Sequence, residues 1–219
     1  VITAGTDDAS EHVSNYVDNA SYVYLGRHTV SDGYYFGARF NNVNIPNGAT
    51  VNSAYLVLTQ HDTYNTNQPV LLVAAHDTDN SPTFSSSNGP LDRGNQLTSA
   101  QVAWTPSAGT PGVEFQSPNI ASVLQEVVNR AGWVSGNSLS VIVKDNEAAV
   151  DHRRRAWAYD GDPALAPRLV ADIETGPTPP PTPTVTPTPF GFKTPTPPPT
   201  ATPVPTATLD PSSRYRDAT

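Results

Sequence analysis

Apolar and polar residues alternate along several stretches of the chain, which is the pattern of β-strands with one buried face. These stretches are rich in Val, Tyr, Phe and Leu, which fit a pleated, half-buried surface. The expected strands span 34–43, 51–60, 70–76, 138–144, 153–159 and 168–173, with weaker patterns at 1–3, 22–25 and 101–104. Strands at this spacing, separated by turn residues, predict an all-β, antiparallel β-sandwich.

Residues 117–132 break the alternation with a helical pattern. Ser117 is a residue type favoured at the N-cap, and Pro118 is favoured at the first helical position. Apolar residues then recur at helical spacing until Gly132, and they are Ile120, Val123, Leu124, Val127 and Val128. The pattern predicts one short amphipathic helix, whose apolar stripe fits packing on the sandwich core better than binding a partner.

Proline divides the chain into a body and an arm. Residues 1–175 contain 9 of the 23 prolines, and residues 176–219 contain the other 14, mostly in Thr-Pro steps. Proline fixes φ and lacks a backbone N–H, so we expect an extended polyproline II arm over 176–219. A body of this length can bury one hydrophobic core, which predicts a single β-sandwich domain over 1–175.

Charge and cysteine content exclude several function classes. The net charge of -8 argues against a nucleic-acid partner, because phosphate binding needs concentrated Lys and Arg. The chain has no cysteine, and therefore no disulfide, thiolate zinc site or Cys nucleophile. The sequence contains no apolar run of about 18 residues, so it predicts no membrane span. The sequence has no Met, including at position 1, so we expect Val1 to be a mature N-terminus left after removal of a leader. This expectation favours an extracellular or cell-surface location.

Several motifs occur along the body in an order and at a spacing that resemble those of a known family. They are Phe36-Gly37-Ala38-Arg39-Phe40, the run 43–51, Val102-Ala103-Trp104, Ala156-Trp157-Ala158-Tyr159-Asp160-Gly161 and Ala166-Pro167-Arg168-Leu169. Over nearly all of 1–175 the chain resembles bacterial extracellular β-sandwich domains related to the DNRLRE-type and carbohydrate-binding-module-like domains, although the DNRLRE hexapeptide is missing. The resemblance implies a jelly-roll-like sandwich on a secreted surface protein and no catalytic residues.

The chain shows no motif of an enzyme or of a tight metal site. Its five histidines, at 12, 28, 61, 76 and 152, lack ligand spacing, and no nucleophile elbow or Gly-rich phosphate loop is present. We therefore expect no catalysis and no cofactor. Asp77 and Asp79 follow an expected strand and offer oxygen ligands for a structural calcium ion, although Asp is also common in loops because it forms Asx-turns.

The expected strand over 153–159 carries the most distinctive side chains. If alternation holds, Arg153, Arg155, Trp157 and Tyr159 share one face. An aromatic pair beside two guanidinium groups can stack on sugar rings, or on the prolines of an extended chain. In the alternative interpretation, the two aromatic side chains point into the core and the arginines lie at its rim.

The arm has candidate sites of its own. Phe190 and Phe192 interrupt the Pro/Thr pattern with large apolar side chains that a spacer does not need, and Val185 and Val204 add smaller ones. These four residues are candidate self-assembly anchors. Candidates for glycosylation are Asn19, in an Asn-x-Ser sequon, and the arm residues Thr182, Thr184, Thr186 and Thr188.

Two functions of different classes follow from these patterns. In the first, the chain is a structural subunit of an extracellular filament, and its arm docks on neighbouring copies to give a head-to-tail homopolymer. In the second, the body is a carbohydrate-binding or adhesion module that binds glycans, and the arm is a Thr/Pro spacer. We expect the first function over the second.

Overall fold

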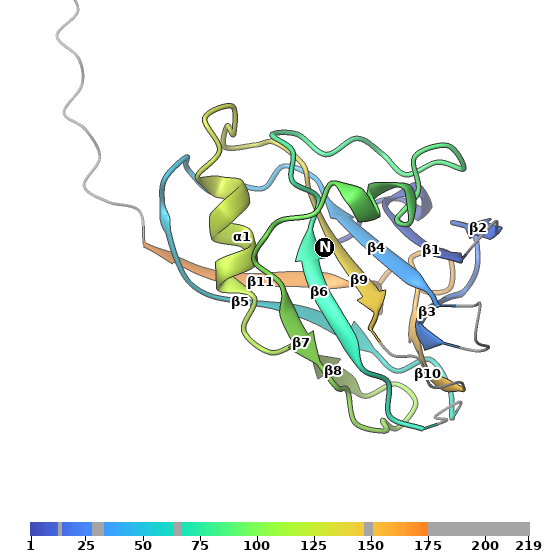
Figure 1. Cartoon of the computed structure of the whole chain (residues 1–219). Coiled ribbons are helices and arrows are strands. Elements are labelled where there is room, and N and C mark those ends of the chain that lie inside the picture. Colours follow the sequence, from blue (N-terminus) through green and yellow to red (C-terminus); the bar gives the residue numbers. More distant parts are fainter. Residues whose placement is uncertain (13–14, 28–32, 64–66, 147–150, 175–219) are drawn as a thin grey trace, which may run out of the picture. The chain divides into compact units, whose positions relative to one another are not determined.

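The body is built from strands that pair in antiparallel fashion throughout (Figure 1). This is a computed structural model, and it describes residues 1–12, 15–27, 33–63, 67–146 and 151–174. The arm and its expected polyproline II conformation lie outside the described residues. In the part of the chain that is described, no helix combines the length and the apolar character needed to cross a bilayer.

One layer of the sandwich is a six-stranded sheet. Its order is β2-β1-β4-β9-β6-β7, so strands distant in sequence lie side by side. The strands are β1 (Asp8–His12), β2 (Asn15–Val17), β4 (Tyr35–Phe40), β6 (Leu71–Ala75), β7 (Val102–Trp104) and β9 (Leu139–Asp145). In the central strand β9, Leu139, Val141 and Val143 are buried in the main core.

The other layer contains two smaller sheets. A three-stranded sheet has the order β11-β5-β8, and a two-stranded ribbon pairs β10 with β3. The strands are β3 (Tyr22–Arg27), β5 (Thr50–Thr59), β8 (Glu114–Gln116), β10 (His152–Trp157) and β11 (Arg168–Glu174). A bridge between Gln60 and Ala156 joins β10 to the end of β5, so the ribbon continues this layer.

The helix α1 (Ala121–Val128) contacts β5 of one layer and β6 of the other (Figure 1). Val123, Leu124, Val127 and Val128 are buried in the main core, as the amphipathic pattern predicted. Two 3₁₀ turns, at Gly5–Asp7 and Asp92–Asn95, complete the regular elements of the described residues. The expected all-β antiparallel sandwich with one short helix is therefore confirmed.

Several details of the sequence-based assignment differ from the structure. Residues 1–3 do not form a strand, whereas β1, β2 and β8 are strands that the patterns did not indicate. Strand β1 reads Asp-Ala-Ser-Glu-His, yet four of its five residues are buried. Because polar residues are buried on both faces of β1, apolar and polar residues do not alternate along it. The alternation used to find the other strands could therefore not reveal this one.

The start of the helix also differs. Ser117 is not the N-cap, because α1 begins at Ala121 and its N-cap position is Ile120. The Ser117 hydroxyl instead accepts the backbone N–H of Leu56 in β5 at 3.0 Å. Asn119 Oδ1 accepts the N–H groups of Ala54 and Ala121, both at 3.0 Å. The residues before α1 thus satisfy backbone donors of β5, which sequence alone cannot show.

Candidate functional site

The ribbon of β3 and β10 brings aromatic and basic side chains together. Trp157 lies opposite Tyr22, and Arg155 lies opposite Tyr24. Residues directly opposite in an antiparallel pair project on the same side of the sheet. The intervening residues Val23 and Ala156 are buried in the core, so the aromatic residues project outward.

Six rings form an unbroken series of contacts on this face. The series runs Trp157, His61, Tyr22, Tyr24, Tyr34 and His12, with ring centroids 4.4, 4.9, 5.1, 4.6 and 4.9 Å apart. Tyr24 and Tyr34 are stacked, and the other pairs are tilted or edge-on, as the ring quadrupole favours. We call these six residues, with Arg153 and Arg155, the aromatic–arginine face.

Arg155 holds the centre of this face in place. Its guanidinium carbon lies 4.6 Å from the ring centroid of Tyr22 and 5.0 Å from that of Tyr24. It donates to Asp62 Oδ2 and to the Tyr24 hydroxyl, both at 3.0 Å. These contacts fix the orientation of the Tyr22 and Tyr24 rings.

Arg153 is more deeply placed, with 4% of its surface exposed. It pairs with Asp151 at 2.8 Å, and its guanidinium carbon lies 5.9 Å from the Tyr24 ring centroid. Arg154, on the opposite side of the strand, is also buried and donates to the backbone carbonyls of Asn67 and Pro106. Arg153 and Arg155 therefore support the rings, while Arg154 supports the surrounding loops.

A pocket of about 230 Å³ adjoins the tyrosine end of the face. Tyr22, Tyr24 and Tyr34 form its aromatic wall. Ser10, His12 and Asn15 contribute polar groups, and Val17 and Ala20 complete the lining. The pocket thus combines flat apolar surfaces with hydrogen-bonding groups, as small-ligand sites commonly do.

The structure separates one residue from the predicted face. Arg153, Arg155 and Trp157 lie together on it, but Tyr159 does not. Strand β10 ends at Trp157, and a turn follows. The Tyr159 N–H donates to buried Asp8 Oδ2 at 2.8 Å, and its side chain packs against the main core. Continued alternation to residue 159 was the wrong assumption, because the strand is two residues shorter.

The other rings of the face were not found from the sequence. His12, Tyr34 and His61 come from three different parts of the chain, and no local pattern links them to β10. Tyr22 and Tyr24 did carry a local signal, because residues two apart in a strand share a face. Their pairing with β10 is a tertiary feature.

Asp77 and Asp79, the predicted calcium ligands, both bind Arg130. Asp79 Oδ1 accepts from the guanidinium Nε at 2.7 Å, and Asp77 Oδ1 accepts from Nη1. Arg130 thereby supplies positive charge between the two carboxylates. No group of three or more His, Cys, Asp or Glu in the described ranges is placed to hold a metal. A calcium ion here would have to displace Arg130, and the site stays a prediction.

Of the remaining candidate residues, one lies in the body and the others lie in the arm. Asn19 is exposed between β2 and β3, where a glycan has access. The anchor candidates Val185, Phe190, Phe192 and Val204 and the threonines Thr182, Thr184, Thr186 and Thr188 lie outside the described residues.

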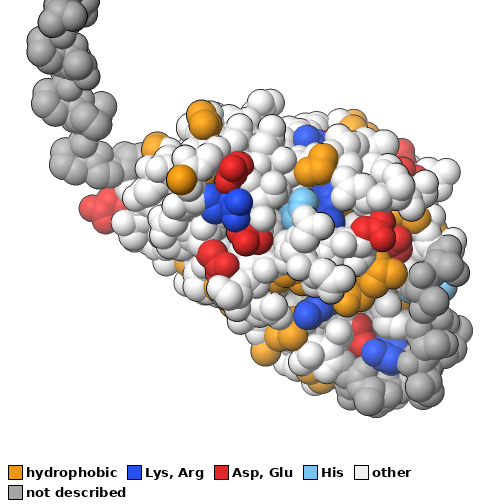
Figure 2. Space-filling model, turned by 45° about the horizontal axis from the view of Figure 1, so that its top comes forward, with side chains coloured by type: hydrophobic (Ala, Val, Ile, Leu, Met, Phe, Trp, Pro, Cys, Tyr) orange, Lys and Arg blue, Asp and Glu red, His pale blue; other side chains and the backbone are white. Residues whose placement is uncertain are grey.

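Charged side chains are dispersed on the face of the body shown in Figure 2. Acidic and basic groups lie near one another, among mostly uncharged polar surface. On this face no broad basic patch of the kind that tracks a phosphate backbone is visible.

Comparison with known proteins identifies no family. No protein-family model matches the chain, and a search of curated proteins finds no match. The resemblance to DNRLRE-type and carbohydrate-binding-module-like domains stays a hypothesis.

Proposed function

We propose that this chain is a structural subunit of an extracellular or cell-surface filament, in which the Pro/Thr-rich arm of one copy docks on the sandwich of the next. The observation that carries the proposal is the aromatic–arginine face. Polyproline II segments bind in grooves lined by aromatic side chains, because flat rings pack against pyrrolidine rings. The chain therefore contains both a surface of this composition and a segment suited to it.

The chemistry of the two partners is complementary. A polyproline II chain leaves its backbone carbonyls unpaired, and these accept hydrogen bonds. The face offers donors beside its rings, including the indole N–H of Trp157, and the Tyr22 hydroxyl, which shares a hydrogen bond with the Tyr24 hydroxyl, adds a further polar group. Each proline that packs on a ring buries apolar surface worth about 25 cal/mol per Å², so several such contacts in series give measurable affinity.

Arm length allows contact between copies. In polyproline II, residues 176–208 of the arm would extend roughly 100 Å, whereas a body of this size is about 40 Å across. An arm that binds the next copy makes a heterologous contact, and such contacts produce filaments when they do not close into a ring.

The test compares the full chain with a version ending at Thr175 by negative-stain electron microscopy and light scattering at matched concentrations. The full chain is expected to form filaments, and the shortened chain is expected to stay monomeric. Assemblies of equal size from both chains would contradict the proposal.

Substitutions on the face sharpen this test. Trp157→Ala is expected to weaken assembly about tenfold, because it removes the end of the ring series. Tyr55→Ala is the matched control, since Tyr55 is also half-buried but lies on β5, outside the face. An equal effect of the two substitutions would mean that general destabilisation, and not loss of the face, weakens assembly.

Carbohydrate binding at the same face is the second candidate function. The pocket beside Tyr22, Tyr24 and Tyr34 favours it, because sugars combine flat C–H surfaces with hydroxyls that need polar partners. Titration of the shortened chain with a panel of oligosaccharides, followed by tryptophan fluorescence, tests this function. Saturable binding that Tyr24→Ala abolishes would support it, and no response to the panel would leave arm docking as the function of the face.

A further inference from the structure

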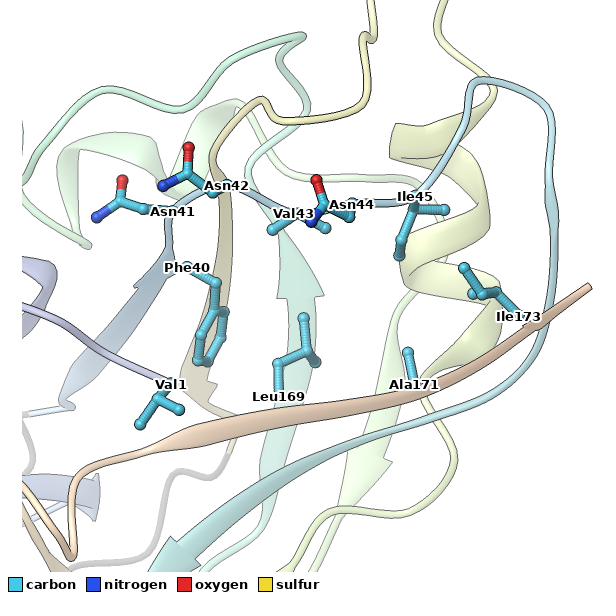
Figure 3. A pocket seen from close by; sticks show the side chains of 10 residues that line it. All are labelled: Val1, Phe40, Asn41, Asn42, Val43, Asn44, Ile45, Leu169, Ala171 and Ile173. Carbon is cyan, nitrogen blue, oxygen red and sulfur yellow. The ribbon is translucent and has the colours of Figure 1, made fainter. Parts of the chain in front are cut away.

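A second surface feature lies far from the aromatic rings, at the open edge of the three-stranded sheet. A groove of about 260 Å³ runs between β11 and residues 40–45 (Figure 3). Phe40 and Leu169 face each other across it, and Ala171 and Ile173 continue its floor along β11. The amide ends of Asn41 and Asn42 point away from the groove. The groove therefore combines apolar side chains along β11 and at Phe40 with polar groups, such as Asn44, on its other side.

Strand β11 has a free edge beside this groove. It pairs with β5 on one side, and among the described residues no strand pairs with its other side. Free edges accept an added strand, because their backbone groups lack partners. Ala171 is exposed although it alternates with Leu169 and Ile173 toward the core side. The middle of β11 is thus accessible from the groove.

The C-terminal half of the opposite side of β11 carries negative charge. Asp172 and Glu174 are exposed, and within the described part of the chain neither forms an ion pair. A strand added here would place alternate side chains in the groove and the others beside these carboxylates. An occupant should therefore alternate large apolar residues with a basic one.

One segment of the arm has this pattern. Residues 190–194, Phe-Gly-Phe-Lys-Thr, lie between Pro189 and Pro195 and contain no proline, so each has a backbone N–H for strand pairing. Phe190 and Phe192 alternate with Gly191 and Lys193. In an extended conformation both aromatic side chains fall on one face, and the ammonium group falls on the other.

We propose that residues 190–194 of one copy add as a short strand to the free edge of β11 in another copy. Phe190 and Phe192 then fill the groove, and Lys193 lies beside Asp172 and Glu174. This inference rests on the proposed assembly through the arm, and it assigns the phenylalanine anchors a site separate from the aromatic–arginine face.

Size and connectivity agree with this placement. A cavity of about 150 Å³ is sufficient to bind benzene, so the groove of about 260 Å³ encloses one phenyl ring, and the second ring packs along its open side. Within one chain, 15 residues separate Glu174 from Phe190, and seven of them are prolines. In the expected polyproline II conformation such a segment would extend roughly 45 Å, which would disfavour the sharp reversal needed to return to its own β11. A neighbouring copy is the favoured acceptor.

Disulfide trapping in full-length chains tests the proposal directly, because the natural chain has no cysteine. A tagged chain carries Gly191→Cys, and an untagged chain carries Asp172→Cys on β11. The two are mixed under mild oxidation, and mixed disulfide dimers are measured by mass. The control replaces Asp172→Cys with Val134→Cys, because Val134 is 61% exposed but lies outside the groove. A disulfide requires Cα atoms within about 7 Å, so trapping reports proximity.

The expected result is at least tenfold more mixed dimer with Asp172→Cys than with Val134→Cys. Adding Phe190→Ala and Phe192→Ala to the tagged chain should reduce trapping to the control level. Equal trapping at both positions would overturn the inference. A third chain carries both Gly191→Cys and Asp172→Cys, and a disulfide that forms only within this chain, and never between chains, would also overturn it. Filaments of the natural chain without selective trapping would overturn the groove assignment and leave the proposed function standing, whereas a natural chain that stays monomeric removes both.

Discussion

At the scale of single residues, the buried charged side chains form hydrogen bonds mostly with neutral groups. Arg93 is 1% exposed and donates to the hydroxyls of Ser81 and Ser140 and to the carbonyls of Pro82 and Thr83. Its guanidinium carbon lies 4.1 Å from the ring centroid of Phe84. Burial, together with the charge of Arg39, lowers the pKa of Arg93 to about 10, so it stays charged at neutral pH. This network ties the loop after β6 to β9.

We predict that Arg93→Met lowers the free energy of unfolding by about 3 kcal/mol or more. Methionine fills much of the space but leaves several buried acceptors without a donor. Urea unfolding followed by circular dichroism measures the effect. Arg168→Met is the matched control, because Arg168 forms an exposed pair with Glu114 and its loss should cost about 1 kcal/mol or less. Similar losses for both variants would show that Arg93 is not structurally central.

Asp8 gives the stability a pH dependence. Burial is the main cause that raises its pKa to about 7, and the charges of Asp160 and Asp7 add to it. The folded state thus keeps a proton that the unfolded state releases near pH 4, so folding stability falls as the pH rises from about 4 to 7, by up to about 4 kcal/mol.

We predict that Asp8→Asn flattens this fall, since asparagine stays neutral and its carbonyl still accepts the Tyr159 N–H. Thermal unfolding between pH 4 and 8 is the measurement. Asp172→Asn, at an exposed site, should leave the profile of the natural chain unchanged. A profile for Asp8→Asn as steep as that of the natural chain would assign the pH dependence to other groups.

At the scale of elements, the β3–β10 ribbon depends on one glycine. Gly26 lies opposite Arg153 with a φ of 97°, which is the left-handed region. A Cβ atom there would lie 2.0 Å from the backbone oxygen of His152. Any other residue would push the two strands apart, and the aromatic–arginine face is carried by these strands.

We predict that Gly26→Ala destabilises the protein by at least about 2 kcal/mol more than Gly48→Ala. Gly48 also has positive φ, at 71°, but an added Cβ there would meet nothing within 4 Å, so its cost is about 1 kcal/mol. Chemical unfolding provides the comparison. Assembly or ligand binding by Gly26→Ala should fall as well, and equal stability of the two alanine variants would show that the ribbon adjusts to the added carbon.

The sequence indicated the strands at the centre of the fold because their alternation is regular, as in β4, β5 and β9. It missed β1 and β8, because polar residues of β1 are buried by tertiary contacts and β8 has only three residues. It found Arg153, Arg155 and Trp157 by alternation within one strand. It did not find His12, Tyr34 or His61, because their positions depend on which strands pair.

At the scale of the whole molecule, the hydrophobic core of the described residues belongs to the body. The residues of the main core run from Ile2 to Ala166. We therefore predict that deletion of 176–219 shifts the midpoint of thermal unfolding by no more than about 2 °C at a concentration where the full chain is monomeric. Calorimetry of the two chains is the measurement. A larger fall would show that the arm packs on its own body.

The amino-acid sequence by itself determined the all-β class, the short amphipathic helix and the change of composition after residue 175. These depend on local periodicity and on proline, which act within a few residues. Tertiary structure alone decided the face and the groove. Six rings from distant segments meet because β10 pairs with β3, and the groove exists because β11 is an edge strand. Strand order is set by packing across the whole core, so no local pattern contains it.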